Sequence, residues 1–396
     1  MISSTSSDQE IEKFLRVVKN DASSDAVLAA QLAKIYVDSG ELYLPGSDLV
    51  ADVASTGGPS SLSTLLCPLF LRSAGLAVPK LGVPGRPAGG IDSLAQVDGY
   101  RAGLSSADLV NIMQTTGYAH FLADGRYAPL DARVFKLRQL HGAQQVPTLV
   151  VASLLSKKIA VGVKLAGLDV RVAPHGNFGL SWSDARHNAE LFVNSAKIHD
   201  IKAYPVLTDG RFPYQPYIGR GEALVALDSI FVGSASKGLA RHFEQCRLLS
   251  LAVTPQDLCG RVATIGPREL QRHFLANLIA QGGSLKAFEQ RVQLVKSKHI
   301  YELRALDNGF FSVFMEGVRQ TLVHYQVKAE KQSDRFSDPV GVILLCESGE
   351  WVRKGDVVAT VRVADVRHKQ RVIRELSTWI CKTSPTPLGV LGEGVF

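Results

Sequence analysis

The chain has 396 residues, 46% of them hydrophobic and 20% charged, which is enough for two or three packed domains. No apolar run reaches the roughly 18 residues that span a bilayer, and the polar N-terminus is unlike a secretion signal. We therefore expect no membrane contact and a cytoplasmic location. A net charge of +7 favours anionic ligands. Because no long Lys/Arg run is present, we prefer a modestly basic surface to a nucleic-acid partner, with nucleic-acid binding as the alternative.

Predicted elements alternate along the chain. Their order is helices within 1–46, a strand at 49–54, a helix at 62–75, a strand and loop at 77–85, a helix at 104–117, helix over most of 131–160, a strand at 168–174, a helix from Ser181 to Ala196 and a strand at 203–209. Strands that alternate with helices predict a mainly parallel sheet covered on both faces. From about residue 322 the sequence becomes rich in Val and Gly, which favours β-structure.

These patterns predict an α/β protein with a small helical domain, a large α/β domain with a mainly parallel central sheet, and a β-rich C-terminal α+β extension. The expected division assigns 1–46 and 126–162 to the helical domain, 47–125 and 163–321 to the α/β domain, and 322–396 to the extension. The five cysteines contain no C-x-x-C pair, so we expect reduced thiols and no metal site.

The loop STGGPSSLS, residues 55–63, is the first candidate site. Its two glycines let backbone approach an anion closely, its hydroxyls are donors, and the following helix adds its N-terminal amides. These features suit a phosphate cradle. A strand-to-helix turn that needs glycine for its backbone angles is the alternative, and the loop alone does not separate the two.

Arg138, Ser153 and Lys157 form the second candidate. Ser153 and Lys157 are four residues apart, so on a helix they lie on one face. Two cations and a hydroxyl suit a ring with several carbonyls that departs as an anion. Exposed lysines and salt-bridged arginines are common, so taken alone that simpler interpretation is preferred.

The surrounding sequence resembles the family of thymidine phosphorylase and pyrimidine nucleoside phosphorylase. The similar segments are YAPLDARVFKLR, VPTLVVASLLSKKIAVGV, LDVRV, AYPVLTD and SDPVGVILLCESGEWVRKGDVVATV, spread over about 50–396. In that family an Arg, a Ser fifteen residues later and a Lys four further on bind the pyrimidine ring. The resemblance therefore implies that Arg138, Ser153 and Lys157 bind the base and act in catalysis.

The phosphate motif departs from the family's D-K-H-S-T-G-G-V-G-D. Val53 stands where the family has a phosphate-binding Lys, and Ala54 where it has a catalytic His; two phosphate-binding hydroxyls are also lost, at Gly82 and Ile91. The phosphate ligands still expected are Ser55, Thr56, Gly57, Gly58 and Ser63. Each lost charged hydrogen bond costs about 1.5–3 kcal/mol, so we expect a severely weakened phosphate site.

Three further residues are assigned by resemblance. Lys80 lies where a sister family, anthranilate phosphoribosyltransferase, has a Lys in V-A-K-H-G-N, which implies a cation for phosphate or a sugar phosphate; a solvated lysine is the alternative. His175 and Phe178, in APHGNFG, match a turn beside the sugar and base. His175 is then a candidate acid or base and Phe178 a base contact, with a structural loop as the alternative.

Together these residues predict a glycosyltransferase that acts on the N-glycosidic bond of a pyrimidine nucleoside and has a degenerate phosphate site. The resemblance implies a homodimer, no cofactor, and inorganic phosphate or a sugar phosphate as co-substrate. A nucleoside hydrolase, a transferase with another donor or acceptor, and a catalytically inactive pyrimidine-binding protein remain open.

Overall fold

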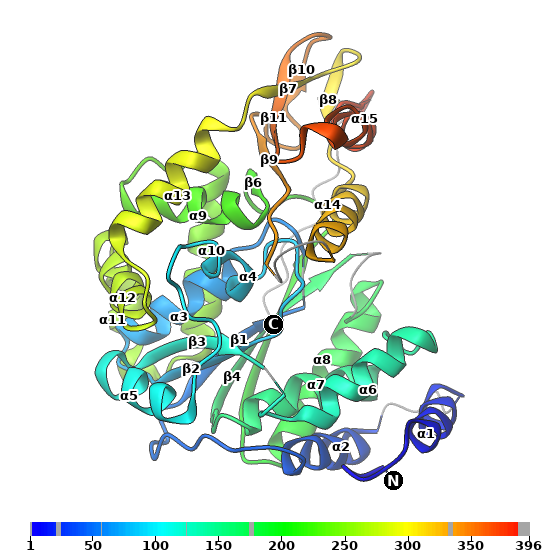
Figure 1. Cartoon of the computed structure of the whole chain (residues 1–396), viewed down its shortest axis with the longest axis vertical. Coiled ribbons are helices and arrows are strands. Elements are labelled where there is room, and N and C mark those ends of the chain that lie inside the picture. Colours follow the sequence, from blue (N-terminus) through cyan, green and yellow to red (C-terminus); the bar gives the residue numbers. More distant parts are fainter. Residues whose placement is uncertain are drawn as a thin grey trace.

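A parallel sheet forms the centre of the computed structural model, which describes residues 2–20, 25–56, 58–123, 125–173, 178–331 and 336–386 (Figure 1). Its strands are β1 (Ala51–Ser55), β2 (Val78–Gly82), β3 (Tyr118–Leu122), β4 (Leu165–Val172) and β5 (Lys202–Asp209). β1, β4 and β5 pair in that order, β2 pairs with β3, and a parallel bridge between Val50 and Ala77 joins the two groups. The resulting order is β3-β2-β1-β4-β5, which confirms the predicted mainly parallel sheet.

Helices cover both faces of this sheet. The helices that precede the C-terminal part are α1 (Asp8–Asn20), α2 (Ala26–Asp38), α3 (Ser63–Ser73), α4 (Gly90–Leu94), α5 (Ser106–Thr116), α6 (Pro129–Leu140), α7 (Pro147–Ile159), α8 (Trp182–Lys197), α9 (Arg220–Phe231), α10 (Lys237–Val253), α11 (Cys259–Thr264), α12 (Pro267–Ala280) and α13 (Leu285–Ser297). α8 packs on β4 and β5, whereas α3 and α10 pack on β1 and β4. All eight residues of β4 are buried, as expected for a strand covered on both faces.

The helical part of the fold consists of α1, α2, α6 and α7, which lie together at one end of the molecule (Figure 1). α2 packs along α7 and also contacts α6 and α8. The predicted helix over 131–160 is interrupted between α6 and α7, where Gly142 has a φ of +62°. Because Pro147 begins α7, the chain has a ready start for a second helix there.

The C-terminal part is built from two antiparallel sheets and two helices. One sheet has the order β6 (Tyr217–Ile218), β9 (Val340–Leu344), β11 (Val357–Val363) and β7 (Tyr301–Arg304), and the other β10 (Trp351–Val352), β8 (Gly309–Phe311) and β12 (Thr383–Ser384). α14 (Met315–Glu330) and α15 (Lys369–Ile380) complete it, around a separate hydrophobic core. α14 runs through position 322, where we expected the β-rich texture to begin.

A buried ion-pair network joins this part to the rest of the protein. Glu222, on α9, accepts hydrogen bonds of 2.7 and 2.9 Å from Arg362, on β11. A Cβ on Gly341 would lie 1.9 Å from the carboxylate carbon of Glu222, so only glycine allows this approach. The C-terminal unit is therefore fixed against the α/β part. None of the helices within the described ranges is long and apolar enough to cross a membrane.

Candidate functional site

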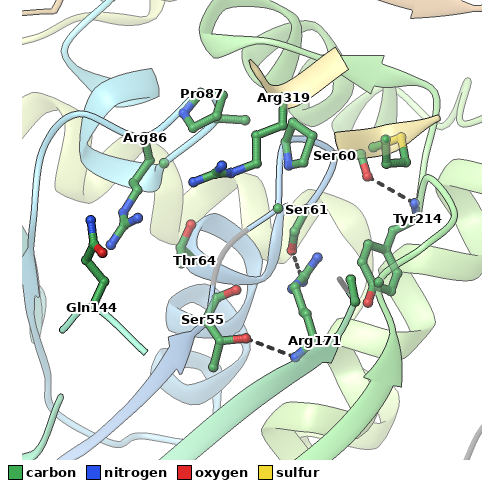
Figure 2. A pocket seen from close by; sticks show the side chains of 18 of the residues that line it. Ser55, Ser60, Ser61, Thr64, Arg86, Pro87, Gln144, Arg171, Tyr214 and Arg319 are labelled. Carbon is green, nitrogen blue, oxygen red and sulfur yellow. Dashed lines mark hydrogen bonds between the residues drawn. The ribbon is translucent and has the colours of Figure 1, made fainter. Parts of the chain in front are cut away.

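A cavity of about 430 Å³ opens at the carboxyl ends of the central strands (Figure 2). Its walls are the loop that follows β1, the loop that follows β2, the connection between α6 and α7, and α14. The residues that line it include Ser55, Thr56, Gly58, Ser60, Ser61, Thr64, Arg86, Phe135, Gln139, Gln144, Gln145, Arg171, Tyr214 and Arg319. In open parallel sheets ligands bind outside the carboxyl ends of the strands, at the point where the connections of two neighbouring strands run to opposite sides of the sheet.

The glycine- and serine-rich loop takes its shape from β4. Arg171 donates its backbone N–H to the Thr56 hydroxyl at 2.9 Å, and its guanidinium hydrogen-bonds Ser61. The same guanidinium pairs with Asp169, which also accepts a 2.7 Å hydrogen bond from the Ser63 hydroxyl. Ser63 is fully buried, so the structure gives this predicted phosphate ligand a supporting role beneath the loop.

Arg171 is itself held from several sides. Its guanidinium lies 4.1 Å from the centre of the Tyr214 ring, a cation–π contact. Burial alone would lower the pKa of Arg171, but Asp169 raises it. Gly58 has a φ of +117°, and a Cβ there would lie 3.3 Å from a terminal nitrogen of Arg171. The loop therefore needs glycine at this position, because its backbone rests on the arginine.

A neutral histidine secures the far end of the loop. His242 accepts a 2.9 Å hydrogen bond from the Leu62 amide through Nε2, and its ring packs on Tyr214. Burial, with the positive charge of Arg171, lowers the pKa of His242 to about 4. The imidazole is therefore uncharged near neutrality, which its acceptor role requires. Tyr214 in turn donates its amide to the Ser60 hydroxyl at 3.1 Å.

Lys80 lies in the sheet and does not line the cavity. Its ammonium donates to the Asp52 carboxylate and to the Val53 carbonyl, both at 2.7 Å, and Lys158 pairs with the other oxygen of Asp52. Burial alone would raise the pKa of Asp52, but Lys158 and Lys80 hold it well below the usual range. The structure thus places the predicted phosphate cation on a buried carboxylate, which pairs with Lys80 through one oxygen and with Lys158 through the other.

The predicted base-binding trio is only partly assembled. Lys157 donates to the Ser153 hydroxyl at 3.1 Å and pairs with Asp131, so the helical spacing does bring Ser153 and Lys157 together. Arg138 is 2% exposed and donates to the carbonyls of Ala143, Gln144 and Leu149. It therefore fixes the connection between α6 and α7, and none of the three predicted residues lines the cavity.

That connection supplies the wall opposite the glycine- and serine-rich loop. Phe135 on α6 lines the cavity, together with Gln139, Gln144 and Gln145. The Arg138 guanidinium lies 5.8 Å from the Phe135 ring centre, so it supports both the ring and the backbone that carries Gln144. An aromatic face with amide groups suits a planar polar ligand.

The remaining predicted residues contribute less. Phe178 is 1% exposed, and its carbonyl accepts a hydrogen bond from Asn188, so it packs in the core. His175 and Gly57 lie outside the described residues. Ser55 and Thr56 line the cavity as predicted for anion ligands, and so does Gly58.

Several lining residues were missed by the sequence reasoning. Arg171 follows Asp169 by two positions at the end of a strand, a spacing that could have indicated a partner for the loop. Arg86 comes shortly after β2 in a Gly- and Pro-rich turn, which is a signal for a ligand-binding loop. Arg319 lies on α14, more than two hundred residues further on, and no local pattern connects it with the cavity.

The fold and cavity define an α/β protein whose ligand site lies at the edge of a parallel sheet. No family model matches the chain. It is 25% identical over 341 residues to a pyrimidine-nucleoside phosphorylase of Geobacillus stearothermophilus, covering 80% of this chain and 76% of the relative. It is also 25% identical over 406 residues to a thymidine phosphorylase of Agrobacterium fabrum, covering 93% and 90%.

The chain is thus similar over most of its length to pyrimidine-nucleoside and thymidine phosphorylases, which confirms the resemblance predicted from the sequence. Among solved structures, an anthranilate phosphoribosyltransferase of Thermus thermophilus aligns with a TM-score of 0.47 and 15% identity, covering 74% of this chain and 96% of that one.

Proposed function

We propose that this protein transfers a pentose at the N-glycosidic bond of a pyrimidine nucleoside, with an anionic partner held at the glycine- and serine-rich loop. The observation that carries the proposal is the cavity, where this loop faces an aromatic ring and amide side chains across about 430 Å³. Its volume is in the range of small-ligand sites. Similarity to phosphorylases over most of the chain supports the choice of reaction class.

The pyrimidine lies on the α6–α7 side of the cavity in this proposal. The Phe135 ring offers a stacking face, and the Gln144 amide can both donate to and accept from the edge of a pyrimidine. Ser153 and Lys157 form a second donor group on α7, already hydrogen-bonded to one another. The resemblance assigns this second group to the base.

Cleavage of the N-glycosidic bond leaves negative charge on the departing pyrimidine and positive charge on the sugar. Donors whose hydrogen bonds strengthen as that charge develops lower the barrier. The resemblance assigns this purpose to Lys157, whose ammonium pairs with Asp131 outside the cavity lining and has to leave that pair to reach the base. Gln144 supplies a neutral amide, so substitutions at the two positions separate the charged donor from the neutral one.

The test measures turnover of uridine, thymidine and cytidine with and without inorganic phosphate. We expect turnover that depends on phosphate, and a loss of kcat/KM of about 100-fold in Lys157→Met, as for the loss of one transition-state donor. Gln144→Ala should raise KM more than it lowers kcat. Lys136→Met, on the exposed side of α6, is the matched control and should behave like the parent protein.

A second candidate, hydrolysis or transfer with another donor or acceptor, is favoured by Val53 and Ala54, which replace the family's Lys and His. Turnover without phosphate supports a hydrolase, and base binding without turnover supports a catalytically silent pyrimidine-binding protein. If no pyrimidine nucleoside or base binds or reacts, both candidates fail. The proposal keeps the expected homodimer and cytoplasmic location, and light scattering in solution tests the dimer.

A further inference from the structure

Two arginines face the cavity without a paired carboxylate. Arg86 and Arg319 both line it, and Figure 2 shows their side chains extending from different elements into the space beside Thr64. Neither guanidinium forms an ion pair or a hydrogen bond with any residue that the structure describes. By contrast, the neighbouring Arg171 pairs with Asp169 and Arg220 with Asp92. The cavity therefore holds two positive charges that no direct ion pair within the described ranges neutralises.

The two charges are close enough to affect one another. Burial, together with the positive charge of Arg319, lowers the pKa of the Arg86 guanidinium. Arginine nevertheless stays protonated in proteins, so the repulsion persists. A pair of like charges that converges on a cavity is stabilised when an anion lies between them, and planar guanidinium groups bind phosphoryl oxygens by paired hydrogen bonds.

The opposite wall supplies neutral donors to the same space. Thr64 lies in the first turn of α3, an eleven-residue helix, and its hydroxyl has no hydrogen-bond partner among the described residues. The helix N-terminus adds partial positive charge. Ser61, fixed by Arg171, lines the cavity next to it. The Ser61 hydroxyl already donates to Ser63, so an anion held by the arginines would meet the Thr64 hydroxyl on its other side.

A single buried residue contacts both elements that carry these arginines. Arg220 is fully buried and donates from Nε to the Arg86 carbonyl at 3.2 Å. It pairs at 3.1 Å with Asp92, which accepts a hydrogen bond from the Arg86 amide, and at 2.8 Å with Glu330 on α14, the helix that carries Arg319. The backbone of Arg86 and the helix that carries Arg319 are therefore fixed relative to one another before any ligand arrives, which reduces the entropic cost of binding.

We propose that Arg86 and Arg319, with Thr64, form a binding site for a phosphoryl dianion. The two arginines supply the cations that the sequence lacks at Val53 and Ala54. The dianion is either inorganic phosphate or the phosphate ester of a pentose, and both present the same oxygens to the two arginines. This inference rests on the proposed function only in that both use the same cavity.

Calorimetry with inorganic phosphate and, separately, with ribose 5-phosphate tests the site. We expect Arg86→Met and Arg319→Met each to weaken binding by about 10- to 100-fold, and the double variant to abolish it. Arg367→Gln, which removes the same charge from a side chain that is 81% exposed, should bind like the parent. Arg86→Lys and Arg319→Lys keep the charge and should retain part of the affinity.

The two ligands distinguish the source of the dianion. Tighter binding of free phosphate identifies a co-substrate, and tighter binding of the ester identifies a phosphorylated sugar; both support the site if they depend on the arginines. Binding that is unchanged in the arginine variants, with melting temperatures like that of the parent, overturns the inference, as does a parent protein that binds neither ligand. Nucleoside cleavage without any anion binding would overturn this site and leave the hydrolase candidate standing. Arginine-dependent anion binding without nucleoside turnover would support this site and overturn the proposed transfer reaction.

Discussion

Lys80→Met separates the structural role of this lysine from the phosphate-binding role that the sequence suggested. The substitution removes one of the two cations that face Asp52, in a pair whose side chains are only 5% and 1% exposed. Breaking a buried ion pair costs about 3–5 kcal/mol. Because Lys158 still pairs with the carboxylate, we expect a loss near the lower limit, about 3 kcal/mol of unfolding free energy.

The anion affinity should respond differently. If Lys80 bound the phosphoryl group, its loss would remove a charged hydrogen bond of about 1.5–3 kcal/mol and weaken binding by about 10- to 100-fold. The Lys80 ammonium instead donates to Asp52 and to the Val53 carbonyl. We therefore expect Lys80→Met to change phosphate affinity by less than about twofold, whereas the loss of a direct charged hydrogen bond would weaken it by about tenfold or more.

The assay pairs urea unfolding, followed by circular dichroism, with calorimetry at a temperature where the variant is fully folded. Asp52→Asn is the companion variant, because it removes the shared carboxylate and should destabilise at least as much. A Lys80→Met protein as stable as the parent but more than tenfold weaker in phosphate binding would refute this reasoning and restore Lys80 as an anion ligand.

Three further predictions concern the glycine- and serine-rich loop. Burial and the charge of Arg171 lower the pKa of His242 to about 4, so on acidification the unfolded chain binds a proton at this residue before the native protein does. The free energy of unfolding should therefore fall by about 3 kcal/mol as the pH drops from 6.5 to 4. In urea titrations, His242→Gln should remove this pH dependence. Ser63→Ala, which loses the 2.7 Å hydrogen bond to Asp169, should cost about 1.5–3 kcal/mol, measured by urea unfolding. Gly58→Ala forces a side chain into a φ of +117° against Arg171; we expect about 1 kcal/mol or more of destabilisation and weaker phosphate binding by calorimetry, and unchanged values would contradict the loop geometry.

The order of elements was predictable because local patterns determine it. The helices opened by Ser105 and Ser181 begin where expected, and each serine accepts a hydrogen bond from the amide three residues on. β3 was missed because its five residues are all buried, and a strand covered on both faces has no alternating pattern. α14 also contradicted expectation near 322, although Val318, Leu322 and Tyr325 are buried at helical spacing.

The site was harder to predict because pairing between distant residues determines it. Ser153 and Lys157 could be placed together from their spacing alone. Lys80 could not be assigned, since its partner Asp52 lies on another strand and becomes its neighbour only through the order of the sheet. The segments that carry Arg86 and Arg319 are joined by Arg220, which contacts the Arg86 carbonyl, Asp92 and, on α14, Glu330. Such charge pairing depends on contacts between distant segments, which a pattern within one stretch of the sequence does not reveal.

The position of Arg319 has a consequence for how ligand occupancy should be felt across the molecule. Its helix belongs to the C-terminal unit, yet its guanidinium closes a cavity built on the parallel sheet. A ligand bound between the C-terminal unit and the α/β part links them reversibly. The free energy needed to separate these two parts therefore rises with the logarithm of the ligand concentration. The C-terminal unit should therefore be cleaved more slowly by proteases as the ligand concentration rises. The rate of its proteolysis then measures the fraction of the protein that has ligand bound.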